Sequence, residues 1–168
     1  MKVIGIDPGL ANTGVAILCG NENQTSDYAF GTIRTSKDKT LASRLHHIYC
    51  EIQKIIKRER PDLMVIEDIF SLEKYPTAGI VLGKVCGVLL LSGQLNGIPT
   101  IEIAAREAKQ VLTGNGNAGK SQVEKAVRHL LNRPTPIRPS HAADALSLAF
   151  IGLYRYSHEK RIKNQLNG

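Results

Sequence analysis

The sequence predicts a single α/β domain with a mixed five-stranded sheet flanked by helices. Two apolar segments near the N-terminus are separated by a tight turn, which is typical of an antiparallel hairpin. A long amphipathic segment then links the hairpin to another apolar, β-branched segment, and such a crossover makes strands parallel. The length of 168 residues fits one domain. We expect the domain to span residues 1–156 and a basic, flexible tail to span 157–168.

Composition indicates a polyanionic partner. The chain has 22 Lys and Arg residues against 15 Asp and Glu, a net charge of +7, and nucleic acid is the commonest partner of such a protein. Aromatic residues make up only 5% and Trp is absent, which argues against a base-stacking platform. The three cysteines lie far apart, so we expect reduced thiols and no zinc site. With no signal-like segment before the first strand, the expected location is cytoplasmic and no membrane contact is expected.

The N-terminal hairpin places a carboxylate at the end of a buried strand. Residues 3–6 form the first strand, Asp7 closes it, and Pro8-Gly9 makes the turn. Residues 13–18 return antiparallel, and residues 28–35 supply a third strand. Asp7 either completes the turn or belongs to a site, because α/β sheets hold ligands at such strand ends.

A helix and a second acidic strand end follow. The helix begins at Leu41 and ends before Pro61, and its apolar residues recur at steps of four and three. Residues 63–66 form a buried strand that ends in Glu67. If this strand neighbours the first, Glu67 faces Asp7.

The next segments offer surfaces for contact. Phe70 lies in a predicted loop, where it either contacts DNA or packs under the loop. A helix over 77–96 carries Gly79, Gly83 and Gly87 at intervals of four, and these small residues let another helix approach, either within the domain or in a second copy. Lys84 and the glycines argue against a membrane span.

The segment after the fifth strand (100–103) is basic. We expect a helix over 104–112 with Arg106 and Lys109 on its polar side. Residues 114–121 match the phosphate-binding pattern GxxxxGK[ST], yet that motif requires a preceding buried strand and a helix precedes it here. We therefore favour a basic loop before a helix over 121–131, with Lys120 facing phosphates.

The last helix completes a candidate metal site. It is expected over 141–156, after a proline-rich segment that carries Arg138. His141 and Asp144 project from the same side of its first turn, and small alanines between them let this turn approach the sheet. Read singly, each is more typical of a helix-end residue. Together with the two strand-end acids they favour Mg²⁺ or Mn²⁺ and a two-metal phosphoryl-transfer site.

At GIDPG, IED, AREAKQ and HAADALSLA the chain resembles the RuvC family of bacterial Holliday-junction endonucleases, which have a ribonuclease H-like fold. The resemblance implies that Asp7, Glu67 and Asp144 are metal ligands and that His141 occupies a position held by Asp in many members. It also implies DNA contacts at Phe70, Lys109 and Lys120.

The same resemblance implies an activity and partners. The implied activity is paired symmetric nicking of four-way junction DNA, with two Mg²⁺ ions per active site, for which Mn²⁺ substitutes. The implied assembly is a homodimer that works with the RuvA–RuvB branch-migration complex. The rival hypotheses are a non-catalytic nucleic-acid-binding protein and a nucleotide-binding enzyme.

Overall fold

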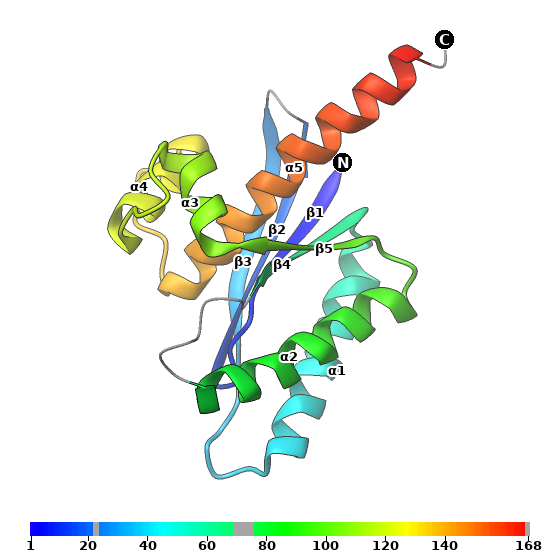
Figure 1. Ribbon diagram of the computed structural model, residues 1–168, viewed down its shortest axis with the longest axis vertical. Helices are drawn as coiled ribbons and strands as arrows, with labels where there is room; N and C mark the ends of the chain where they lie inside the picture. The colour runs from blue at the N-terminus through cyan, green and yellow to red at the C-terminus, as the bar shows by residue number, and fades with distance from the viewer. Residues whose placement is uncertain (22–23, 69–75, 167–168) are drawn as a thin grey trace.

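The computed structural model describes residues 1–21, 24–68 and 76–166. These residues form five strands and five helices (Figure 1). The strands are β1 (Lys2–Asp7), β2 (Asn12–Gly20), β3 (Thr25–Arg34), β4 (Leu63–Asp68) and β5 (Thr100–Ala104). The helices are α1 (Leu41–Glu59), α2 (Pro76–Leu95), α3 (Ala105–Thr113), α4 (Lys120–Leu130) and α5 (Ser140–Leu166).

The strands make one mixed sheet in the order β3-β2-β1-β4-β5. The hairpin strands pair antiparallel, and β4 pairs parallel with both β1 and β5, so the predicted five-stranded mixed sheet is confirmed. Ile6 pairs with Ile66, and the next residues, Asp7 and Glu67, therefore lie side by side at the carboxyl ends of neighbouring strands.

Helices cover both faces of the sheet, with α5 running diagonally across one face and α1 and α2 on the other (Figure 1). Side chains alternate between the two faces along each strand. In β1, Val3 belongs to the core beneath α5, whereas Ile4 and Ile6 belong to the core formed with α1 and α2. The same alternation in β4 puts Val65 under α5 and Met64 on the opposite side.

Helix α5 is the central helix of the domain. The sequence predicts one apolar face, but almost every side chain from Ala142 to Leu153 is buried. The reason is that α3 and α4 pack on the side of α5 that faces away from the sheet. Their residues Ala108, Val123 and Val127 join the same core.

Glycines allow α5 to lie directly on the sheet. A Cβ atom added to Gly5 would overlap the carbonyl oxygen of Ala145, and one added to Gly14 would overlap the carbonyl oxygen of His141. The backbones of α5 and of strands β1 and β2 are therefore in contact. The predicted close approach of the first turn of α5 is confirmed.

The bounds of several elements differ from the prediction. The last helix does not end at Tyr156 but continues to Leu166, because residues 157–166 contain neither Pro nor Gly and consist largely of residues compatible with a helix. Strands β2 and β3 are longer than predicted, so the connection between them is shorter, and their register shifts at Cys19/Gly20.

Helix α2 has the length and composition of a membrane span over Thr77–Leu95, where the mean hydropathy is 1.7. Its inner side nevertheless packs in the domain core, where Val85 and Leu89 are fully buried beside Ile66 of the sheet. Its outer side carries Ile80, Leu91 and Leu95, which are 64%, 52% and 62% exposed. This packing makes α2 a layer of the domain with an apolar outer surface.

Replacing Gly5 with Ala tests the contact between α5 and the sheet. The new methyl group has no room against Ala145, so we expect the free energy of unfolding to fall by about 1–3 kcal/mol, as for other overpacked cores. Chemical denaturation measures the loss. The control is Gly31→Ala on β3, where an added Cβ meets nothing within 4 Å; equal stability of the two variants would contradict the tight contact.

Candidate active site

Two neighbouring strands supply the first two carboxylates. Asp7 lies two residues after Gly5 and four after Val3 in β1, and Glu67 has the same spacing from Val65 and Leu63 in β4. Because side chains alternate between the two faces of a strand, both carboxylates point toward the face that α5 covers. Asp7 is buried, with a side chain only 11% exposed. The predicted meeting of Asp7 and Glu67 is confirmed by the parallel pairing of the two strands.

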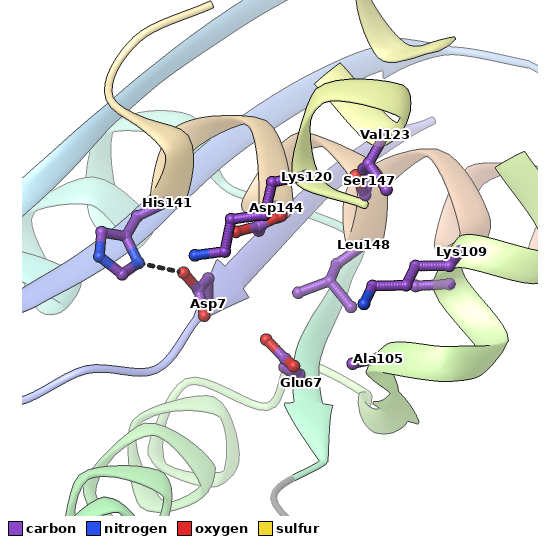
Figure 2. A pocket seen from close by; sticks show the side chains of 11 residues that line it. Asp7, Glu67, Ala105, Lys109, Lys120, Val123, His141, Asp144, Ser147 and Leu148 are labelled. Atoms are coloured by element: carbon purple, nitrogen blue, oxygen red, sulfur yellow. Dashed lines mark hydrogen bonds and ion pairs between the residues drawn. The ribbon is translucent and has the colours of Figure 1, made fainter. Parts of the chain in front are cut away.

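The first turn of α5 supplies the other two side chains. His141 and Asp144 are three residues apart and point toward the same strand ends (Figure 2). Gly14 allows this, because it is the residue of β2 paired with Asp7 and it lies against the backbone of His141. Bare backbone at Gly14 thus brings the helix down onto the end of β1.

Asp7, His141 and Asp144 form a compact group of possible metal ligands. The Nδ1 atom of His141 lies 2.6 Å from the Oδ2 atom of Asp7. One ligand atom from each of the three residues lies within 4.8 Å of the other two. Glu67 stands on the opposite side of Asp7, with its carboxylate directed into the same space (Figure 2).

The four side chains line a pocket of about 220 Å³ that also contains two lysines. Lys109 reaches it from α3 and Lys120 from the first residue of α4, as Figure 2 shows. The pocket therefore combines carboxylates at its base with cations at its sides. This arrangement suits a phosphate that is held by lysines and bridged to the carboxylates by cations.

Burial makes the carboxylates difficult to ionise together. Burial is the largest cause of the raised pKa values, about 6 for Asp7 and about 8 for Glu67. The charge of Asp144 also raises both pKa values, and Asp7 raises that of Glu67, whereas the hydrogen bond with Glu67 lowers that of Asp7. Burial also raises the pKa of Asp144, while Lys120, His141 and Lys109 act in the opposite direction. The acids are thus crowded beyond what the two lysines compensate.

A divalent cation fits this donor set. A divalent cation that lies between crowded carboxylates offsets their mutual repulsion. Oxygen ligands favour Mg²⁺ and Mn²⁺, and neutral imidazole is a further suitable ligand for divalent transition metals. The observed donor set therefore fits a divalent metal centre formed by Asp7, Glu67, Asp144 and His141.

The remaining predicted contact residues are placed differently. Arg106 is exposed on α3 outside the pocket, and Arg138 lines the adjoining groove rather than the pocket itself. Phe70 lies outside the described residues. The segment 114–121 follows helix α3 and not a strand, which agrees with the preference for a basic loop over a nucleotide-binding loop.

Sequence reasoning missed Ser147, which lines the pocket one turn after Asp144. Its hydroxyl donates to the carbonyl oxygen of Ala143 at 2.8 Å, which satisfies it within the helix. The spacing of three residues from Asp144 was the available indication, since such residues share a helix face.

A family model matches most of the chain. The model for the crossover junction endodeoxyribonuclease RuvC covers residues 3–152. The chain belongs to the RuvC family. It is 39% identical over 158 residues to the RuvC of Carboxydothermus hydrogenoformans, which covers 92% of this chain and 97% of that relative. The family resemblance predicted from the sequence motifs is therefore confirmed, as is the endonuclease class.

Solved RuvC structures share the fold. The structure of Thermus thermophilus RuvC matches with a TM-score of 0.83 and 27% identity, over 95% of this chain and 97% of that one. The same protein in complex with a Holliday junction substrate matches with a TM-score of 0.86 and 26% identity, over 95% and 96% of the two chains. The predicted ribonuclease H-like α/β fold is confirmed.

Proton binding and metal binding should compete in this pocket. Carboxyls with a raised pKa bind more protons in the folded protein than in the unfolded chain, so the metal-free protein should lose stability as pH rises from about 4.5 toward 8. Mg²⁺ displaces those protons, and its affinity should rise over the same range.

Calorimetry with and without Mg²⁺ at several pH values measures this competition. We expect Mg²⁺ to raise the melting temperature more at pH 8 than at pH 6. Glu67→Gln should reduce the pH dependence, because it removes the carboxyl with the highest raised pKa. An Mg²⁺ effect that is equal at all pH values in the wild-type protein would contradict the coupling.

Proposed function

We propose that this protein is a divalent-metal-dependent endonuclease that resolves Holliday junctions in DNA recombination and repair. It makes paired symmetric nicks that leave 5′-phosphate and 3′-hydroxyl ends. The observation that carries the proposal is the convergence of Asp7, Glu67, His141 and Asp144 with two lysines in one pocket of a RuvC-family chain. A relative of the same fold is solved with a Holliday junction substrate.

The carboxylates hold the metal in this proposal. Asp7, Glu67 and Asp144 bind two Mg²⁺ ions, for which Mn²⁺ substitutes, and these would supply an activated water and a stabilised leaving oxygen when bound. Lys109 and Lys120 orient the scissile phosphate through their charges. The first turn of α5 fixes the geometry, because its backbone rests on Gly14.

His141 is the fourth ligand. Its ring lies 2.6 Å from Asp7 and is 37% exposed, so it can reach both the buried acid and a ligand entering the pocket. An imidazole in place of a carboxylate lowers the negative charge of the pocket and favours Mn²⁺. The competing role is proton transfer during hydrolysis. In that case, replacing His141 with Asp would lower the nicking rate without changing the metal affinity.

Junction binding rests on basic side chains around the pocket. Lys109 and Lys120 contact phosphates at the active site, Arg138 contacts them in the adjoining groove, and Arg106 contacts them from α3. Phe70 engages bases at the crossover.

Residues 1–156 form the nuclease domain, and the basic segment 157–168 is a tail.

The protein acts as a homodimer, because two symmetric nicks need two active sites and a two-fold pair supplies them. The outer side of α2 is our candidate interface. It carries the exposed apolar residues Ile80, Leu91 and Leu95, and an added Cβ at Gly87 meets nothing within 4 Å. This bare position lets a second helix approach closely. The protein works with the RuvA–RuvB complex in the cytoplasm.

Asp7→Asn tests the metal site. The variant loses a metal ligand and a negative charge near phosphate, so we expect at least a hundredfold slower nicking of a four-way junction in saturating Mg²⁺, with junction affinity equal or higher. His141→Ala should behave similarly and His141→Asp should retain nicking. Gel assays of cleavage and binding separate the two effects.

The control for these variants is Asp27→Asn, which removes an exposed acid on β3 away from the pocket. It should nick at the wild-type rate. Full activity in Asp7→Asn would contradict the metal site. A wild-type protein that binds the junction but does not cleave it in Mg²⁺ or Mn²⁺ would instead support non-catalytic binding.

Leu91→Glu tests the dimer. A carboxylate at the centre of the exposed α2 surface is tolerated by the folded monomer but must lose water in an α2–α2 interface, so we expect monomers in sedimentation velocity at concentrations where the wild type is dimeric. Val111→Glu on α3 is the matched control, because Val111 is 47% exposed and Leu91 52%. Dimers that persist in Leu91→Glu would move the interface elsewhere.

A further inference from the structure

A second groove adjoins the active-site pocket. Lys120 and Asp144 line both hollows, so the groove continues directly from the site of the expected chemistry. Its walls come from the first turns of α4 and α5 and from the segment before α5, which carries Arg138. Its far wall contains Arg34, the last residue of β3.

The sheet explains why Arg34 reaches this place. Strand β3 is the edge strand next to β2, and α5 begins on β2 at Gly14. Gly14 pairs with Thr32, so the end of β3 lies beside the start of α5. Arg34 also lines the hollow between the sheet and α1. Arg34 therefore lies where a DNA strand that leaves the pocket along the groove would pass the β3 edge of the sheet.

The charges in this groove favour a polyanion. The side chain of Arg34 is exposed, and its guanidinium has no hydrogen bond or ion pair with any of the described residues. The acid Glu124 is already engaged, since it accepts the backbone N–H of Ile137 at 2.9 Å and lies 3.2 Å from Arg128. With Asp144 assigned to metal binding, the groove presents Arg34 and two further cations to its occupant.

We propose that Arg34 binds a phosphate of the cleaved DNA strand close to the scissile phosphate and directs that strand along the groove toward the edge of the sheet. This inference rests on the proposed nuclease function and adds a contact residue and a path to it. A guanidinium suits the task because it stays charged and binds phosphate oxygens with two donors.

Single-phosphate neutralisation tests the contact. Methylphosphonate is placed at one position at a time around the nick, and junction affinity is measured for the wild type and for Arg34→Ala. We expect one non-scissile position where the neutral group weakens wild-type binding several-fold but leaves the affinity of Arg34→Ala unchanged. A penalty that persists at every position in Arg34→Ala would overturn the proposal.

The salt dependence of binding gives a second measurement. Loss of one phosphate contact should lower the slope of log affinity against log salt by about 0.9. The matched control is Lys57→Ala, which removes an exposed cation of α1 at the opposite end of the sheet. Arg34→Lys should keep most of the slope. Equal slopes for Arg34→Ala and Lys57→Ala would also overturn the contact.

Wild-type nicking of the same junction separates this proposal from the function on which it rests. Cleavage by the wild type together with unchanged binding in Arg34→Ala removes only the Arg34 contact. Absence of wild-type cleavage removes the nuclease function, whereas the methylphosphonate result still reports on phosphate binding by Arg34. Thermal midpoints of the variants show whether each remains folded.

Discussion

The contact between α5 and the sheet is the constraint on which the site depends. His141 and Asp144 reach the ends of β1 and β4 only because the backbone of α5 rests directly on Gly5 and Gly14. A side chain at either glycine would hold the helix away by the thickness of a methyl group or more. If His141 and Asp144 are metal ligands, as we propose, they must be placed within a fraction of an ångström, and the bare backbone at these two glycines makes that placement possible.

This packing gathers acids that repel one another in a buried place. The carboxyls of Asp7 and Glu67 have a raised pKa because burial opposes their ionisation, and Lys109 and Lys120 offset only part of the negative charge. The free-energy cost of burying these acids is offset by the two hydrophobic cores, one on each face of the sheet, which stabilise the domain. A divalent cation held by these carboxylates would relieve the repulsion and would supply the chemistry of the proposed function.

The surfaces of the layers on the two sides of the sheet differ in character, one basic and the other apolar. Cations surround the pocket on the α5 side, where Arg138 and Arg34 extend the basic lining beyond the active site. The apolar outer side of α2 lies on the other face. In the proposed function, DNA binding and dimerisation would therefore use different layers, and a dimer formed through α2 would leave both active sites open to DNA.

The sequence by itself determined the order of elements, the mixed sheet and the four residues of the site, because period-two and helical patterns record burial and because acids that follow buried strands meet at one sheet edge. The sequence motifs also identified the family. Only the tertiary structure decided that residues 142–153 of α5 are buried on almost all sides, since α3 and α4 cover this part of the helix. It likewise decided where Arg34 lies, because strand order and the position of a helix on the sheet arise from contacts between segments far apart in the chain, which no local pattern encodes.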